Sequence, residues 1–141
     1  MDEGRELNLS FVNTGVPHAV LAVTDIEKTE VQELGHAIRY HKEFAPAGTN
    51  ANFVQIKDNH TLIVRTYERG VEGETLACGT GVTASSLVFA AKKMVESPVS
   101  CVTRGGETLT IFFELDSGGL PAKNVQLEGP AVVCFKGTVE V

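Results

Sequence analysis

The sequence lacks the features that mark membrane-spanning, secreted and nucleic-acid-binding proteins. No apolar run approaches the ~18 residues that a membrane span requires. The opening residues MDEGRELNLS lack the basic and apolar regions of a secretory signal. The formal net charge is −6, and basic residues are scattered singly or in pairs. We therefore expect a cytoplasmic protein with no membrane insertion and no nucleic-acid partner.

Cysteine is scarce, and its spacing argues against several kinds of site. The three cysteines Cys78, Cys101 and Cys134 are far apart, and no CxxC pair occurs. This spacing argues against a zinc site, a redox dithiol or a disulfide framework, so we expect reduced thiols. Cys101 and Cys134 stand among β-branched or aromatic residues, which predicts a structural packing role for both.

Length and pattern together predict a single α+β domain over residues 1–141. The chain has 43% hydrophobic and 21% charged residues, which is ordinary for a globular protein of this size. A first, amphipathic helix is predicted from Thr24 or Asp25 to about Phe44. Short apolar segments separated by glycine-rich turns predict mostly antiparallel strands. These are Leu7–Val12, Ala19–Val23, Phe53–Lys57, Thr61–Glu68, Val99–Thr103, Thr108–Leu115, Val125–Leu127 and Ala131–Phe135.

A second predicted helix, over Val82–Val95, has few polar interruptions. Apolar side chains occur on most of its sides, so it should be surrounded by protein rather than lie on a surface. A sheet curled around this helix would bury all of its faces. We therefore predict a barrel-like sheet wrapped around a central helix.

The string ACGTG, residues 77–81, places a thiol on a glycine-rich turn directly before that helix. Backbone N–H groups at a helix start carry partial positive charge, which lowers the pKa of a cysteine and also binds carboxylates. Gly79 and Gly81 would let a ligand approach the backbone closely, and Thr80 adds a hydroxyl donor, so a substrate carboxylate could be held beside Cys78. The alternative is a buried structural cysteine next to a tight turn.

Three further clusters carry polar groups that suit a binding site. TYERG contains Glu68 and Arg69, and a guanidinium can hold a carboxylate in bidentate fashion. GVPH contains His18, and AGTNANF offers Asn50 and Asn52 on a predicted loop. Taken singly, these groups are also consistent with a solvated ion pair, a structural histidine and turn-forming asparagines.

In their order and spacing, GVPHAV, IRYHKEFAPAGTNANF and RTYERGVEGETLACGTG resemble the C-terminal half of the diaminopimelate epimerase family. The resemblance extends from about Phe11 to the closing EGPAVVCFKG. It implies one of two lobes, each a barrel-like sheet around a helix, with the active site between them. It also implies epimerisation of LL- and meso-diaminopimelate by two cysteines, without pyridoxal phosphate, metal or another cofactor.

The resemblance assigns roles to individual residues. Cys78 is similar to the proton-transferring cysteine of this lobe, and Gly79 and Thr80 to the backbone clamp on the reacting carboxylate. Residues Asn50, Glu68 and Arg69 match positions that hold the substrate. Residues His18 and Glu68 match positions that support the reactivity of the thiols.

Two departures from the family accompany the resemblance. Val16 stands at a substrate-contacting position where many members have asparagine. The N-terminal lobe with its own cysteine turn is absent, so the partner thiol is missing, and we expect a fragment that is inactive alone. The alternatives are a homodimer that pairs two Cys78 residues, a related proline racemase or phenazine-pathway isomerase, and a non-catalytic amino-acid-binding fragment.

Overall fold

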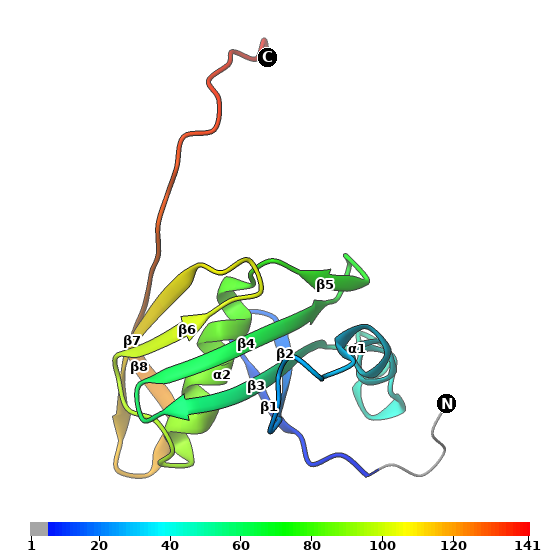
Figure 1. The fold of residues 1–141 in the computed structure, drawn as a ribbon, viewed down its shortest axis with the longest axis vertical. Coiled ribbons are helices and arrows are strands. Elements are labelled where there is room, and N and C mark those ends of the chain that lie inside the picture. The colour runs from blue at the N-terminus through cyan, green and yellow to red at the C-terminus, as the bar shows by residue number, and fades with distance from the viewer. Residues whose placement is uncertain (1–5) are drawn as a thin grey trace.

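The computed structural model describes residues 6–141 and contains one mixed sheet wrapped around a helix (Figure 1). The eight strands run in the order β1-β2-β3-β4-β6-β7-β8, and the short β5 pairs with β4 outside this path. Two pairs, β2–β3 and β4–β6, are parallel, and the other pairs are antiparallel. The elements are β1 (Ser10–Asn13), β2 (Pro17–Ala22), α1 (Val31–Arg39), a 3-10 turn (Lys42–Phe44), β3 (Asn50–Asp58), β4 (Thr61–Glu68), β5 (Gly73–Thr75), α2 (Gly79–Ala91), β6 (Val99–Val102), β7 (Thr108–Asp116) and β8 (Gly119–Glu128).

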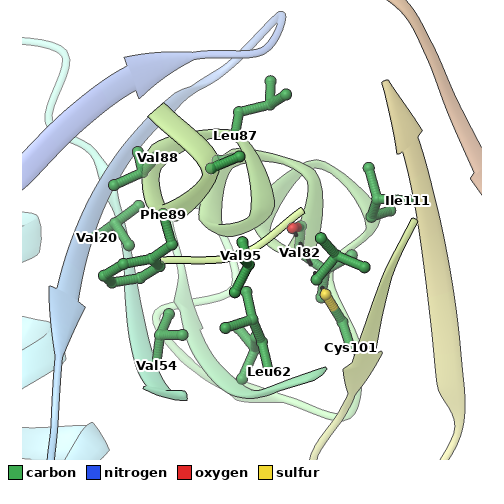
Figure 2. Close-up of a cluster of buried hydrophobic side chains, with 14 of the residues drawn as sticks. Val20, Val54, Leu62, Val82, Leu87, Val88, Phe89, Val95, Cys101 and Ile111 are labelled. Carbon is green, nitrogen blue, oxygen red and sulfur yellow. Dashed lines mark hydrogen bonds between the residues drawn. The ribbon is translucent and has the colours of Figure 1, made fainter. Parts of the chain in front are cut away.

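Helix α2 lies inside the curled sheet, as the sequence predicts. It contacts β1, β2, β3, β4, β6, β7 and β8, and nine of its thirteen residues are buried. Figure 2 shows its side chains among those of the surrounding strands, with Phe89 packed in a cluster that includes Val20, Val54 and Leu62. The predicted α+β fold with a sheet around a central helix is therefore confirmed.

Serines are tolerated inside α2 because their hydroxyl groups bond to the helix backbone. Ser85 Oγ donates to the Gly81 carbonyl and Ser86 Oγ to the Val82 carbonyl, each at 2.8 Å. A buried hydroxyl without a partner would cost about 1–3 kcal/mol. These bonds let a helix that contains serines occupy the middle of an apolar core.

Helix α1 covers the outer surface of β3 and β4 and forms a second core cluster. Val31 and Ile38 of α1 pack there with Phe53 and Tyr67. Gly35 faces Tyr67 so closely that a Cβ at this position would overlap the tyrosine Cβ and ring. The glycine therefore permits the close approach of α1 to the sheet.

The first helix begins later than predicted. Asp25 does not cap a helix, because its carboxylate accepts hydrogen bonds from the backbone of Glu27 and Lys28 within a turn. Arg65 holds this turn from the sheet, since its Nη1 donates to the carbonyls of Ile26 and Thr29. The helix consequently starts at Val31 rather than at Thr24 or Asp25.

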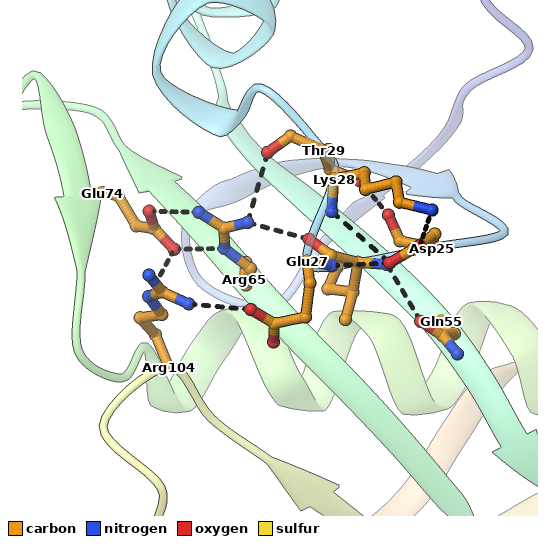
Figure 3. A network of polar contacts seen from close by, with 9 residues as sticks. Asp25, Glu27, Lys28, Thr29, Gln55, Arg65, Glu74 and Arg104 are labelled. Atoms are coloured by element: carbon orange, nitrogen blue, oxygen red, sulfur yellow. Dashed lines mark hydrogen bonds and ion pairs between the residues drawn. The ribbon is translucent and has the colours of Figure 1, made fainter.

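Arg65 belongs to a polar network that joins the turn, β4 and β5 (Figure 3). Its guanidinium binds both carboxylate oxygens of Glu74, at 2.6 and 2.8 Å, and it is only 9% exposed. Arg104 extends the network to Glu27 at 3.4 Å. The bidentate pair satisfies the buried charge and fixes β5, the strand that leads toward Cys78.

The C-terminal residues do not form the predicted strand Ala131–Phe135. Residues 129–141 have no regular secondary structure and extend away from the sheet (Figure 1). Phe135 is 87% exposed and Cys134 is exposed, so the predicted packing role of Cys134 is wrong. Cys101 is fully buried, as expected. In the described residues, no helix is both long and apolar enough to cross a membrane.

Candidate active site

The N-terminus of α2 is built around Cys78. This residue directly precedes the helix in an extended conformation, and its carbonyl accepts the first helical hydrogen bond, from Val82 N at 3.0 Å. Its sulfur lies 3.6 Å from Thr80 Oγ1. The helix begins at Gly79, three residues before the predicted start, so the thiol lies at the helix terminus as the sequence indicates.

The environment of Cys78 does not lower its pKa, contrary to the sequence-based expectation. Burial raises the pKa of the thiol, and hydrogen bonds from Thr80 and from the Gly81 backbone only partly oppose this effect. The nearby carboxylate of Glu68 raises it further. In this chain the protonated thiol is therefore the favoured form at neutral pH.

His18 lies directly beside this helix start. Its side chain is completely buried, and its Nε2 is 2.9 Å from Thr80 Oγ1. Burial lowers the pKa of His18 to about 4, and the positive charge of Arg69 contributes in the same direction. The ring is therefore neutral at physiological pH and forms hydrogen bonds as an uncharged imidazole.

Asn50 and Arg69 are brought together by the sheet. Asn50 opens β3, opposite His18 in the parallel pairing of β2 and β3. Its Oδ1 accepts from Arg69 N at 2.7 Å, and its Nδ2 donates to the Pro17 carbonyl at 3.0 Å. The amide thus orients the loop after β4, while the Arg69 side chain donates to the Ala47 carbonyl at 3.2 Å.

Glu68 ends β4 with its carboxylate close enough to Cys78 to affect the thiol pKa. Thr75 Oγ1 donates to Glu68 Oε1 at 2.6 Å, which orients the carboxylate. The loop after Glu68 is held by Glu72, whose carboxylate accepts from Gly70 N at 2.8 Å and from Arg39 Nε at 3.0 Å. Thr75 thus orients the Glu68 carboxylate and Glu72 holds the loop that follows it. Neither residue is singled out by the sequence.

Val16 lies in the turn between β1 and β2, and its carbonyl accepts from Thr14 N at 3.2 Å. Thr14 Oγ1 donates to the Thr80 carbonyl at 3.3 Å, so this turn touches the start of α2. Valine offers no side-chain hydrogen bond at this position. The turn therefore borders the site through Thr14.

A cavity of about 630 Å³ adjoins the site on the side of Arg69. The rings of Phe11 and Phe44 line it and stack with centroids 5.6 Å apart, and Pro17 also lines it. A second cavity of about 630 Å³ is lined by Leu7, Leu21 and Leu34, and it contains none of the candidate site residues. Among residues 6–141, no group of three or more His, Cys, Asp or Glu side chains is arranged to hold a metal ion.

Asn52, which the sequence predicted on a loop, is a buried member of the site. It lies on β3 rather than on a loop, and it is 1% exposed. Its amide contacts His18 at 2.9 Å and the hydroxyl of Thr66 at 3.0 Å. Side chains two residues apart on a strand share a face. A strand assignment beginning at Asn50 would therefore have placed both asparagines on one face.

Proteins of similar sequence identify the family of this chain. The family model described as diaminopimelate epimerase matches residues 10–119. The chain belongs to the diaminopimelate epimerase family. It is 52% identical over 136 residues to a diaminopimelate epimerase of Aquifex aeolicus, covering 96% of this chain and 47% of the relative. It is 42% identical over 135 residues to that of Chlorobaculum tepidum, covering 94% of this chain and 50% of the relative.

The chain therefore spans about half the length of the curated relatives that it matches. Two solved structures share its fold at low identity. One is a phenazine biosynthesis protein of the PhzF family from Bacillus anthracis, with a TM-score of 0.54 at 16% identity. The match covers 80% of this chain and 36% of that protein. The other is a probable proline racemase from Agrobacterium radiobacter, with a TM-score of 0.51 at 13% identity. The match covers 80% of this chain and 38% of that protein.

Proposed function

We propose that this chain supplies one half of the active site of a diaminopimelate epimerase, with Cys78 as one of two proton-transferring thiols. The observation that carries the proposal is the position of Cys78 at the start of α2, near the carboxylate of Glu68 and next to the Thr80 hydroxyl that His18 contacts. The relatives that are 42–52% identical over almost the whole chain are named diaminopimelate epimerases. The name of these relatives supports diaminopimelate as the substrate.

The chemistry is a two-base proton transfer. One cysteine, as a thiolate, takes the α-proton of the amino acid and becomes a thiol, which leaves a carbanion at the α-carbon. A second thiol gives a proton to the opposite face and becomes a thiolate, so charge and atoms balance. Because Cys78 favours the thiol form in this chain, we assign it the role of proton donor.

The start of α2 suits the reacting carboxylate. The backbone N–H groups of Gly79 and Thr80 have no acceptor within the helix, and the helix dipole favours negative charge there. Preorganised donors of this kind stabilise the negative charge that develops when the α-proton leaves. We assign the carboxylate to these groups and the distal part of the substrate to Arg69, beside the aromatic cavity.

The second thiol belongs to a partner lobe, in this proposal. The described cysteines cannot replace it, because Cys101 is buried and its pKa is raised to about 11, and Cys134 lies on the extended tail. A test is to mix this chain with the N-terminal half of the Aquifex aeolicus relative and to follow conversion of LL- to meso-diaminopimelate. We expect no turnover from either half alone and measurable turnover from the mixture.

The alternatives give other outcomes in the same experiment. Turnover by this chain alone would favour a homodimer that pairs two Cys78 residues. Turnover of proline but not of diaminopimelate by the mixture would favour the racemase alternative, whose fold this chain shares. A mixture that binds diaminopimelate without turnover would favour the non-catalytic alternative.

A further inference from the structure

The side chain of Asn52 has one orientation that its neighbours permit. One amide atom lies 3.1 Å from the Ala19 carbonyl oxygen, and a carbonyl oxygen only accepts hydrogen bonds. The atom is therefore Nδ2. The opposite amide atom, Oδ1, accepts from Thr66 Oγ1 at 3.0 Å, which agrees with this orientation.

This orientation determines the tautomer of His18. Asn52 Nδ2 lies 2.9 Å from His18 Nδ1, and Nδ2 is a donor, so Nδ1 must carry the lone pair. A neutral imidazole has one N–H group, which is then Nε2–H. Nε2 lies 2.9 Å from Thr80 Oγ1, so the ring donates to this hydroxyl.

The hydroxyl of Thr80 is thereby directed toward the sulfur. Its oxygen accepts from His18, and its own hydrogen is free to point to Cys78 Sγ at 3.6 Å. We propose that Asn52 is a positioning residue that holds His18 as the Nε2–H tautomer, so that the Thr80 hydroxyl donates to the sulfur of Cys78. This inference rests on the proposed function of Cys78 in proton transfer.

The hydrogen bonds that run from Asn52 through His18 and Thr80 to Cys78 form a relay, and this relay affects the charge state of the sulfur. A hydroxyl that donates to sulfur stabilises the thiolate more than the thiol, because the negative charge strengthens the hydrogen bond. It opposes the effects of burial and of the Glu68 carboxylate, both of which favour the thiol. Arg69 is the nearby cation that acts on His18. The relay thus reduces the free-energy difference between the thiol and the thiolate of Cys78, the two forms that proton transfer requires.

The test of the relay uses this chain without substrate. In a Cys134→Ser background, the rate of alkylation of Cys78 by iodoacetamide is measured from pH 6 to 11. Thr80→Val removes the hydroxyl at nearly constant volume, and Thr80→Ser retains it. We expect Thr80→Val to lower the rate about tenfold below the thiol pKa, which corresponds to a rise of about one pKa unit. The alkylation rate of Cys78 in Thr80→Ser should stay within about twofold of the rate in the Cys134→Ser chain.

The tautomer is measured directly by 15N NMR of the imidazole nitrogens at pH 7. We expect His18 to carry its hydrogen on Nε2 in the unaltered chain, a measurement that needs no variant to fold. Asn52→Asp provides an acceptor to Nδ1, so Nδ1 should become protonated. A hydrogen on Nδ1 of His18 in the unaltered chain would overturn the proposal, as would equal alkylation of Thr80→Val and Thr80→Ser.

These outcomes are separable from those of the proposed function. The relay fails if the tautomer or the thiol pKa contradicts it, even when the mixed halves epimerise diaminopimelate. The epimerase proposal fails if the mixed halves give no turnover, even when the relay operates in this chain.

Discussion

Gly81→Ala is the substitution that most directly tests how tightly the helix start packs on the polar site. A Cβ at Gly81 would overlap Asn52 Oδ1 and would lie 3.2 Å from Cys78 Sγ. Asn52 is buried and held by Thr66 and the Ala19 carbonyl, so it cannot move aside without losing hydrogen bonds.

The magnitude follows from opposing effects. Alanine in a helix is favoured over glycine by about 1 kcal/mol. Overpacking costs about 1–3 kcal/mol, and a displaced buried amide loses hydrogen bonds worth about 1–3 kcal/mol. We expect Gly81→Ala to lower the free energy of unfolding by about 1–5 kcal/mol, seen as a lower urea midpoint at unchanged m value.

Gly79→Ala is the matched control. Its Cβ would meet only the Cδ1 of Leu127, at 3.2 Å, and that side chain is 47% exposed and free to move. We expect its stability to range from that of the unaltered chain to about 1 kcal/mol higher, because alanine is favoured over glycine in a helix. A Gly81→Ala chain as stable as the Gly79→Ala chain would refute the packing argument.

Three further predictions concern the core, the loop before β5 and the thiols. Phe89→Ala should reduce the free energy of unfolding by about 3–5 kcal/mol, because this ring is 2% exposed within α2; chemical denaturation checks this, and a loss under 1 kcal/mol would contradict it. The pKa of Glu72 is lowered to about 2, chiefly by the Gly70 N–H, so its contribution is present above the unfolded pKa of about 4.3 and is lost as pH falls toward 2. Glu72→Gln should therefore reduce the melting temperature at pH 6 more than at pH 2.5, and an equal reduction at both would contradict the assignment. Brief treatment with iodoacetamide should modify the exposed Cys134 first and Cys78 next, and peptide mapping that finds Cys78 first would contradict the raised pKa of that thiol.

The last prediction reverses an expectation from the sequence. The glycine turn before α2 suggested a lowered pKa for Cys78. The structure supplies burial and the neighbouring Glu68, which together outweigh the hydrogen bonds from Thr80 and the Gly81 backbone. Local sequence shows that a thiol begins a helix, but the burial of its sulfur and the approach of the Glu68 carboxylate arise only in the folded chain.

Other features were predictable to different degrees. An apolar segment with no polar face must be enclosed, so the position of α2 within the sheet could be predicted from sequence. The later start of α1 could not, because Arg65 binds carbonyls of the preceding turn from β4. The contact between His18 and Asn52 depends on the parallel pairing of β2 with β3, which local patterns do not specify. The C-terminal strand prediction failed because residues 129–141 pair with no strand among the described residues.

The central claim, that Cys78 exchanges the α-proton, is tested most directly by solvent deuterium incorporation into diaminopimelate. This chain, mixed with the N-terminal half of the Aquifex aeolicus relative, would be compared as unaltered, Cys78→Ala and Cys134→Ala forms. The account predicts conversion to the epimer with deuterium at the α-carbon for the unaltered and Cys134→Ala forms, and loss of conversion for Cys78→Ala. Undiminished conversion by the Cys78→Ala form would contradict it.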